Sequence, residues 1–203
     1  MPAQRERQPW PMKWVAVAIL AVIVPYTYLT LHYRRPEKAF EPYHDMKDRA
    51  NTLRLLSAGF QRITLAAERP ADPSRAGGSA PVSAAAGGVP GALHETLVEP
   101  PLLPAEIARV SAAPAANSLL AYPIDLTCSQ PDNKQQLAGA QAYVREHEIW
   151  IAPEFERLAG NLLSRTRETT ARLTFPPGAL KPGRYRVTLL GANASKTWTL
   201  EVK

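Results

Sequence analysis

The longest apolar run of the chain lies near its N-terminus. Residues 14–24 read WVAVAILAVIV, and no charged side chain follows until Arg34. The 20 residues from Trp14 to Tyr33, at about 1.5 Å of rise per residue, would form a helix of roughly 30 Å, the thickness of the hydrocarbon core of a bilayer. The pattern predicts a transmembrane helix over 14–33, preceded by a short tail over 1–13.

Aromatic side chains stand near both ends of this run. Trp10 and Trp14 lie near its start, and Tyr28 and Tyr33 lie near its end. Aromatic rings favour the membrane–water interface, so we expect these four residues to act as membrane-interface anchors. The competing interpretation is a cleaved signal peptide, but no Ala-x-Ala site of small residues follows the apolar core. An uncleaved signal anchor is therefore favoured.

Apolar residues at helical spacing follow the predicted span. Asp45 is placed to cap a helix, Gly59 weakens it by about 1 kcal/mol, and Pro70 ends it. Between these limits apolar side chains recur at spacings of 7, 3, 4 and 3, which places them on one face of an α-helix. The sequence predicts a juxtamembrane amphipathic helix region over 34–68. Its candidate partner-docking seam consists of Met46, Leu53, Leu56, Phe60 and Ile63.

An apolar seam on a helix must be shielded from water, and three kinds of contact could shield it. The seam could pack on the protein's own C-terminal domain, or lie on the bilayer surface with nearby Lys and Arg side chains toward the headgroups. It could also dock a partner protein or a second copy of the chain. We expect docking or self-association, because a small membrane subunit would use such a surface.

The sequence predicts a linker over 69–102, of which 69–91 has almost no bulky apolar side chain and the rest is transitional, with a candidate extended edge segment. The stretch 69–91 reads RPADPSRAGGSAPVSAAAGGVPG, which is mainly Ala, Pro, Gly and Ser. Such a composition cannot bury enough surface to offset the entropy lost on ordering the chain. We expect a disordered linker, roughly 25 Å in root-mean-square length, on which the distal domain moves freely.

From residue 103 the pattern changes to short alternating runs separated by turn residues, which is typical of β-structure. YPIDLTC alternates from Tyr122 to Cys128, and TTARLTF alternates from Thr169 to Phe175. Roughly five to seven such strands in about 100 residues are typical of a small sandwich. The sequence therefore predicts a mainly β C-terminal domain over 103–203, built as an antiparallel sandwich.

The end of the chain carries a family resemblance. PGRYRVTLL and TWTLEV, joined by GANASK, resemble the last two strands of immunoglobulin-like and fibronectin-type-III-like modules of bacterial envelope proteins. The resemblance covers about 30 residues and implies an Ig-like fold without implying a function. We expect Leu189 opposite Trp198 and Arg186 opposite Glu201, a register that puts the apolar side chains of the hairpin on one face.

Charge and cysteine content narrow the function classes. The chain carries 24 Lys and Arg against 18 Asp and Glu, a net charge of +6, without a concentrated basic stripe. Nucleic-acid binding depends on such a stripe, often with aromatic side chains interleaved, so this function is not expected. Cys128 is the single cysteine, which excludes an internal disulfide and predicts a small apolar residue inside a strand.

No set of residues predicts catalysis. The chain lacks G-x-S-x-G, H-E-x-x-H and C-x-x-C, motifs whose spacing brings a nucleophile or metal ligands together. The adjacent residues from His44 to Met46 are poorly spaced to converge on one metal ion, and alternation points His147 away from both of its glutamate neighbours. We therefore expect no enzymatic activity, no cofactor and no metal site.

These features predict a single-pass membrane protein that acts as a non-enzymatic adaptor or structural interaction module. Its expected partners are the lipid bilayer and a protein, or a second copy, bound through the juxtamembrane helix. The alternative is an accessory or assembly subunit of a membrane enzyme complex such as a respiratory oxidase. The layout is similar to that of small one-span oxidase-associated proteins with a β module outside the membrane.

The orientation of the predicted span rests on pattern. Three basic residues precede the span and three follow it closely, so the positive-inside rule favours neither direction. The span begins the chain as signal anchors do, and a linker with a β module resembles an exported layout. We expect a protein of the bacterial inner membrane whose C-terminal domain lies outside the cytoplasm, in the periplasm.

Overall fold

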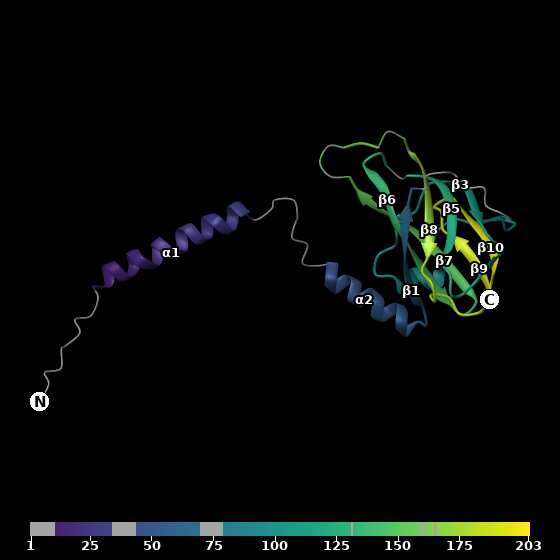
Figure 1. Ribbon diagram of the computed structural model, residues 1–203, viewed down its shortest axis with the longest axis horizontal. Coiled ribbons are helices and arrows are strands. Elements are labelled where there is room, and N and C mark those ends of the chain that lie inside the picture. Colours follow the sequence, from purple (N-terminus) through teal and green to yellow (C-terminus); the bar gives the residue numbers. More distant parts are fainter. Residues whose placement is uncertain are drawn as a thin grey trace, which may run out of the picture. The chain divides into compact units, whose positions relative to one another are not determined.

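The computed structural model describes residues 11–33, 44–69, 79–130, 132–158, 160, 162–164 and 166–203. The chain divides into two compact units between residues 43 and 44. The first unit contributes one helix, α1, and the second contributes two helices and all the strands (Figure 1).

α1 runs from Met12 to Tyr33 and covers the predicted span. Its segment Met12–His32 is long and apolar enough to cross a membrane, and none of it is buried within the protein. Pro25 lies inside the helix, as membrane helices tolerate when nearby groups satisfy the freed backbone carbonyl. The prediction of one apolar N-terminal helix of spanning length is confirmed.

Two of the four predicted interface anchors are described. Trp14 and Tyr28 lie on α1 and are exposed. The Tyr28 ring stacks on His32, four residues later, with 5.8 Å between ring centroids. Trp10 and the side chain of Tyr33 lie outside the described part of the chain. Whether these residues contact lipid headgroups stays a prediction.

The second unit is built on one ten-stranded sheet. Its strands follow one another in space as β2-β10-β9-β7-β6-β1-β8-β5-β3, with β4 beside β10. The helices are α2 His44–Ser57 and α3 Gly91–Thr96. The strands are β1 Gln61–Glu68, β2 Ser83–Ala86, β3 Ile107–Ala112, β4 Ala115–Ala116, β5 Tyr122–Ser129, β6 Gln135–Arg145, β7 Glu148–Arg157, β8 Glu168–Phe175, β9 Gly183–Leu189 and β10 Ala194–Val202.

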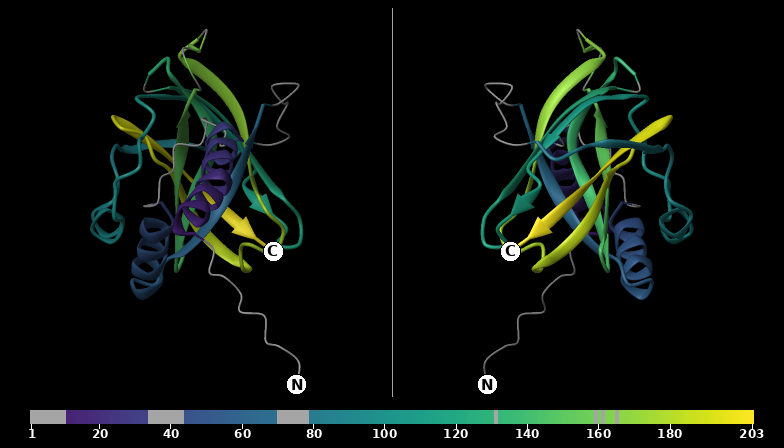
Figure 2. Two further views of the ribbon diagram at one scale, coloured as in Figure 1. Left: turned by 90° about the vertical axis from the view of Figure 1, so that its left-hand side faces the viewer. Right: turned by 90° about the vertical axis from the view of Figure 1, so that its right-hand side faces the viewer.

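The sheet curls into a half-barrel around its core (Figure 2). Its neighbouring strands are antiparallel, except that β7 runs parallel to β9 and β10 runs parallel to β4. An Ig-like sandwich consists of two antiparallel sheets packed face to face. The parallel β7–β9 pair, in the middle of one continuous sheet, departs from that arrangement. The mainly β class is confirmed, and the Ig-like sandwich is not.

β1 corrects the predicted extent of the juxtamembrane helix. The sequence placed 34–68 in one helical region, but β1 is a strand at the centre of the sheet, between β6 and β8. Ile63 and Leu65 are buried in the main core, since alternate side chains of a strand face the same side. Ile63 was predicted to belong to the docking seam and belongs to this core instead.

Strand and helix also replace part of the predicted linker. Residues 70–78 lie outside the described part, but β2 pairs with β10, and α3 forms a single turn and a half further on. Leu93 of α3 is fully buried, and Leu97 is nearly so. β2 can form a strand with small side chains alone, because its backbone groups are hydrogen-bonded to β10. The compact unit therefore begins at α2 and not, as predicted, at residue 103.

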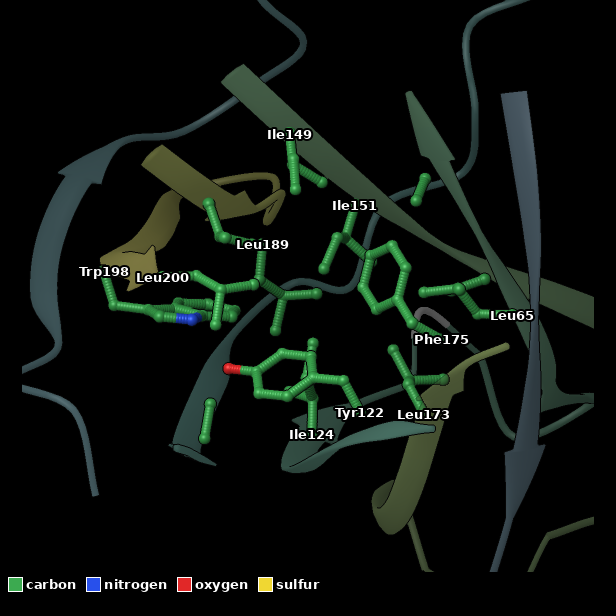
Figure 3. Close-up of a cluster of buried hydrophobic side chains, with 14 of the residues drawn as sticks. Leu65, Tyr122, Ile124, Ile149, Ile151, Leu173, Phe175, Leu189, Trp198 and Leu200 are labelled. Carbon is green, nitrogen blue, oxygen red and sulfur yellow. The ribbon is translucent and has the colours of Figure 1, made fainter. Parts of the chain in front are cut away.

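The main core fills the inside of the curled sheet (Figure 3). Tyr122 packs against Phe175 with 6.2 Å between ring centroids, and its hydroxyl donates to the backbone oxygen of Ala113 at 2.7 Å. Cys128 is fully buried, as expected, and burial raises the pKa of its thiol to about 11. Other inward side chains shown in Figure 3 are Leu65, Ile124, Ile149, Ile151, Leu173, Leu189, Trp198 and Leu200.

The final hairpin pairs two residues away from the predicted register. Trp198 lies opposite Val187 instead of Leu189, and Arg186 lies opposite Thr199 instead of an acid. A shift of two residues keeps every side chain on its face, whereas a shift of one would exchange the faces. Trp198 is therefore buried as predicted although its partner is different.

The turn of this hairpin explains the different register. The turn consists of residues 190–193, since β9 ends at Leu189 and β10 begins at Ala194. Ser195 therefore belongs to β10, and it is fully buried. The Ser195 hydroxyl accepts the backbone N–H of Gly191 at 3.3 Å. A Cβ on Gly191 would lie 2.3 Å from the carbonyl oxygen of Ala194. Only glycine fits this close backbone approach, and the alternation of apolar residues carries no information about it.

Candidate functional site

α2 ends in a Schellman motif that the letters LLSAGF encode. The N–H of Phe60 donates to the carbonyl of Leu55 at 2.8 Å, and the N–H of Gly59 donates to the carbonyl of Leu56 at 3.0 Å. Gly59 has a φ of +78°, the left-handed conformation that glycine adopts without a Cβ penalty. Gly59 is therefore the stop of α2 and not a weak point inside a longer helix.

α2 packs on the sheet through Leu55, which is 1% exposed. Together with Phe60 it enters a second hydrophobic cluster, on the outer face of β6 and β7. These two strands are thus buried on both faces, between the main core and this cluster. The members of the second cluster are Leu55, Phe60, Leu93, Leu97, Tyr143, Trp150, Ala152 and Leu190.

Arg145 covers two aromatic rings of the second cluster. Its guanidinium carbon lies 4.6 Å from the centroid of the Phe60 ring and 5.6 Å from that of Trp150. Such cation–π contacts contribute about 0.5–1 kcal/mol at partly exposed sites. Phe60, which was predicted to belong to the docking seam, is 1% exposed and anchors α2 to the sheet instead.

The other three residues of the predicted seam form a stripe on the outer face of α2. Met46 is 72% exposed, Leu53 is 68% exposed and Leu56 is 62% exposed. Leu55 follows Leu53 by two residues, or about 200° around the helix, so the buried side and the stripe lie on opposite faces. We call Met46, Leu53 and Leu56 the α2 stripe. Whether it docks a partner stays a prediction.

A cleft of about 310 Å³ lies on the sheet side of α2, between its first half, the segment 98–102 and the sheet. The side-chain amide of Gln141 forms a polar floor and is nearly buried. Its oxygen accepts from Nε of Arg62 at 3.0 Å and from the hydroxyl of Thr64 at 3.2 Å. Its nitrogen donates to Oε2 of Glu154 at 3.1 Å. The floor therefore joins β1, β6 and β7 through one amide.

Ion pairs form the walls of the cleft. Nζ of Lys47 on α2 lies 2.6 Å from Oε1 of Glu99. Nη1 of Arg62 on β1 lies 3.7 Å from Oδ1 of Asp48 on α2. These side chains are partly exposed, so each pair contributes about 1 kcal/mol or less. Their effect is to hold α2 over the cleft, because each pair joins the helix to a different neighbour.

The chemistry of the cleft is that of hydrogen bonding. Tyr143 is a buried lining residue, and desolvation raises the pKa of its phenol, while the charge of Arg62 lowers it and that of Glu154 raises it. A phenol with a raised pKa stays neutral near pH 7 and is a poor nucleophile or base. Among the described residues, no group of three His, Cys, Asp or Glu side chains is placed to hold a metal ion.

The turn REHEIW joins β6 to β7 and lies away from the cleft. Glu146 has a φ of +54°, which is found at tight turns. His147 is exposed, and its ring centroid lies 6.2 Å from that of Tyr185. His147 therefore lies on a solvated turn.

Sequence reasoning missed the cleft. Arg62 and Gln141 meet there although they are 79 residues apart in the chain. One local signal was present, since QRITLAAE alternates Arg62 and Thr64 with Ile63 and Leu65. That period of two indicates a strand. It competed with a helical spacing that continues from α2, and the helical interpretation was wrong beyond Gly59.

Comparisons with known proteins assign no family to this chain. No family model matches it, and neither does any curated protein or solved structure. The candidate site consists of the α2 stripe on one side of the helix and the cleft on the other, and its geometry is the basis for the function.

Proposed function

We propose that the chain is a single-pass membrane protein whose β domain acts close to the bilayer as a non-enzymatic adaptor or structural interaction module. The observation that carries the proposal is the short connection between α1 and the sheet. Residues 34–43, ten in all, separate α1 from α2. An extended chain of this length spans at most about 40 Å.

The fusion of α2 to the sheet supports the same function. α2 leads through Gly59 into β1, which pairs on both sides at the centre of the sheet. Leu55 and the ion pairs of the cleft fix the helix further. The stretch 69–102, expected to act as a long flexible arm, leaves β1 and re-enters the sheet at β2. We propose that a domain tethered by so few residues acts within reach of the bilayer, as an adaptor at a membrane would.

We propose that the protein contacts its surroundings, either the bilayer surface or a protein partner, through the α2 stripe. The alternative function is an accessory or assembly subunit of a membrane enzyme complex such as a respiratory oxidase, and the same short connection favours it. In both cases we propose the bacterial inner membrane as the location, with the β domain outside the cytoplasm. A reporter active only in the periplasm, fused after Lys203, would be inactive if that orientation were wrong.

Affinity purification of the full chain in mild detergent tests the function. We expect a protein partner to be recovered in stoichiometric amount through the β domain, and a membrane oxidase or transporter among the partners would favour the accessory-subunit function. Recovery of the chain alone, at every detergent concentration tried, would contradict both. Leu53→Asp should change the recovery of a partner that binds the α2 stripe, and Thr199→Asp, at an exposed residue of β10, is the matched control because it adds the same charge without altering the stripe.

A further inference from the structure

We propose that the α2 stripe lies on the lipid surface, so that α2 is an interfacial helix that fixes the orientation of the β domain on the membrane. The inference deepens the proposed function and rests on it, because it requires α1 to be in the bilayer. A partner protein and a second copy of the chain are the competing occupants of the stripe.

The area of the stripe favours lipid over a protein. Its three side chains are 62–72% exposed and offer together on the order of 250 Å² of apolar surface. A stable protein–protein interface buries about 800 Å² on each partner, of which about 450 Å² is apolar. An interfacial helix needs only a shallow apolar face, because it sinks to the boundary between headgroups and acyl chains.

The charges around the stripe match an anionic lipid surface. Arg49 lies between Met46 and Leu53 on the same side of α2, and Arg54 lies on the flank of the helix, about 100° around from Leu53; both are exposed. Long basic side chains at such positions extend toward phosphate groups while their methylene stems cover apolar surface. Asp48 of α2 pairs with Arg62 on the side of the sheet, away from the stripe.

Because the connection to α1 is short, even a weak contact between the α2 stripe and lipid would suffice to hold α2 on the surface. A tethered contact forms at a high effective concentration set by the length of its tether, and here the tether is residues 34–43. Met46 lies at the end of α2 that this tether enters. A free helix with three apolar side chains would bind lipid only weakly, whereas a tether of ten residues would raise the effective concentration of α2 at the surface.

This placement has a structural consequence for the cleft. Leu55 and the cleft lie on the side of α2 opposite the stripe. With the stripe on lipid, the α2 residues that line the cleft would lie on the side of the helix away from the bilayer.

Spin labelling of the full chain in vesicles tests the inference. Leu53→Cys and, as a control, Thr199→Cys are labelled in phosphatidylcholine vesicles containing phosphatidylglycerol. Cys128 can stay, because it is buried and its thiol is protonated at the labelling pH. We expect the label at 53 to gain collisions with oxygen and lose collisions with a water-soluble nickel complex, relative to the same protein in detergent. The label at 199 should change in neither.

Charge removal gives a second readout. Arg49→Gln with Arg54→Gln should lower the ratio of lipid-bound to free α2 about fivefold for each charge removed, as expected for basic residues near an anionic surface. The same pair of substitutions should have little effect in vesicles of phosphatidylcholine alone.

Three results would overturn the inference. A label at 53 that stays accessible to the nickel complex, in protein that resists carbonate extraction, removes the lipid contact and leaves the proposed function intact. A label shielded from both reagents indicates a protein contact, and dipolar broadening between labels identifies a second copy. Protein that carbonate extracts from the vesicles refutes the membrane anchoring itself, and the inference with it.

Discussion

Leu55 and Leu56 are neighbours in the sequence but occupy opposite environments, and this contrast allows a direct test of how α2 is seated. Leu55 is 1% exposed and Leu56 is 62% exposed. The sequence pattern selected Leu56 as the functional apolar residue of this pair, whereas the structure makes Leu55 the one that packs on the sheet. Replacing each by alanine separates the two roles.

The expected magnitude follows from burial. Leu55→Ala removes three carbon atoms at about 0.8 kcal/mol each, or roughly 2.4 kcal/mol of transfer free energy. A cavity term adds to this, and buried Leu→Ala changes fall in the range of about 2–5 kcal/mol. α2 covers the sheet from outside and can settle into part of the space, so we expect about 3 kcal/mol. Leu56→Ala should change the free energy of unfolding by about 0.5 kcal/mol or less.

Urea unfolding of the full chain in mild detergent measures both effects through the fluorescence of the buried Trp150 and Trp198. A loss of about 3 kcal/mol corresponds to a melting temperature lower by roughly 6–12 °C for a domain of this size. Equal losses for Leu55→Ala and Leu56→Ala, or a larger loss for Leu56→Ala, would refute the seating of α2 through Leu55.

Three further predictions concern stability and reactivity. Gly59→Ala should lower the free energy of unfolding by about 1–2 kcal/mol, because Gly59 has a φ of +78° and a Cβ there meets only open space, so the effect is one of backbone strain. Gly59→Asn should lower it less, and equal losses would count against the Schellman stop. Cys128 should react with a thiol reagent at pH 8 only after unfolding, and rapid labelling of folded protein would disprove its burial. Because its folded pKa is about 11 against an ordinary 9, the stability that it contributes should be present below pH 9 and be lost as the pH rises toward 11. Asp125→Asn should cost about 1–2 kcal/mol in urea unfolding, since Arg172 donates to both carboxylate oxygens at 2.7 and 3.1 Å, and high salt should shrink the difference from the parent protein; a loss that is insensitive to salt would contradict an ionic contribution.

The candidate site was only partly predictable from the sequence. The helical spacing placed Met46, Leu53 and Leu56 on one face, and all three are exposed on α2. It also included Phe60 and Ile63, which are buried in two different cores. The spacing was extended past Gly59, where the chain changes from helix to strand. Periodicity alone does not reveal which of two competing periods applies at such a junction.

The cleft was beyond sequence reasoning for a different reason. Its floor and walls come from α2, β1, β6, β7 and the segment 98–102, and none of these contains a motif by itself. The position of β1 between β6 and β8 decides that Arg62 reaches Gln141. Strand order depends on contacts between distant segments, which a local pattern does not encode.

The final hairpin shows the same division on a smaller scale. Alternation determined which side chains face the core, and Trp198 is buried as it required. The register was set by the turn, where Gly191 and Ser195 close the chain more tightly than the apolar pattern suggested. Shifts of two residues are invisible to a pattern of period two.

The sequence by itself determined the features that depend on near neighbours: the apolar helix of spanning length, the mainly β class, the burial of Cys128 and the exposed stripe of α2. The tertiary structure decided that residues 61–68 form the central strand and that Ala-rich residues 83–86 form an edge strand. The local preference of a segment for helix or strand is weak. The unpaired backbone N–H and C=O groups of a neighbouring strand can form hydrogen bonds with any segment that the fold brings beside it. The tertiary structure likewise fuses α2 to the sheet through Gly59 and Leu55, which no single stretch of the sequence specified.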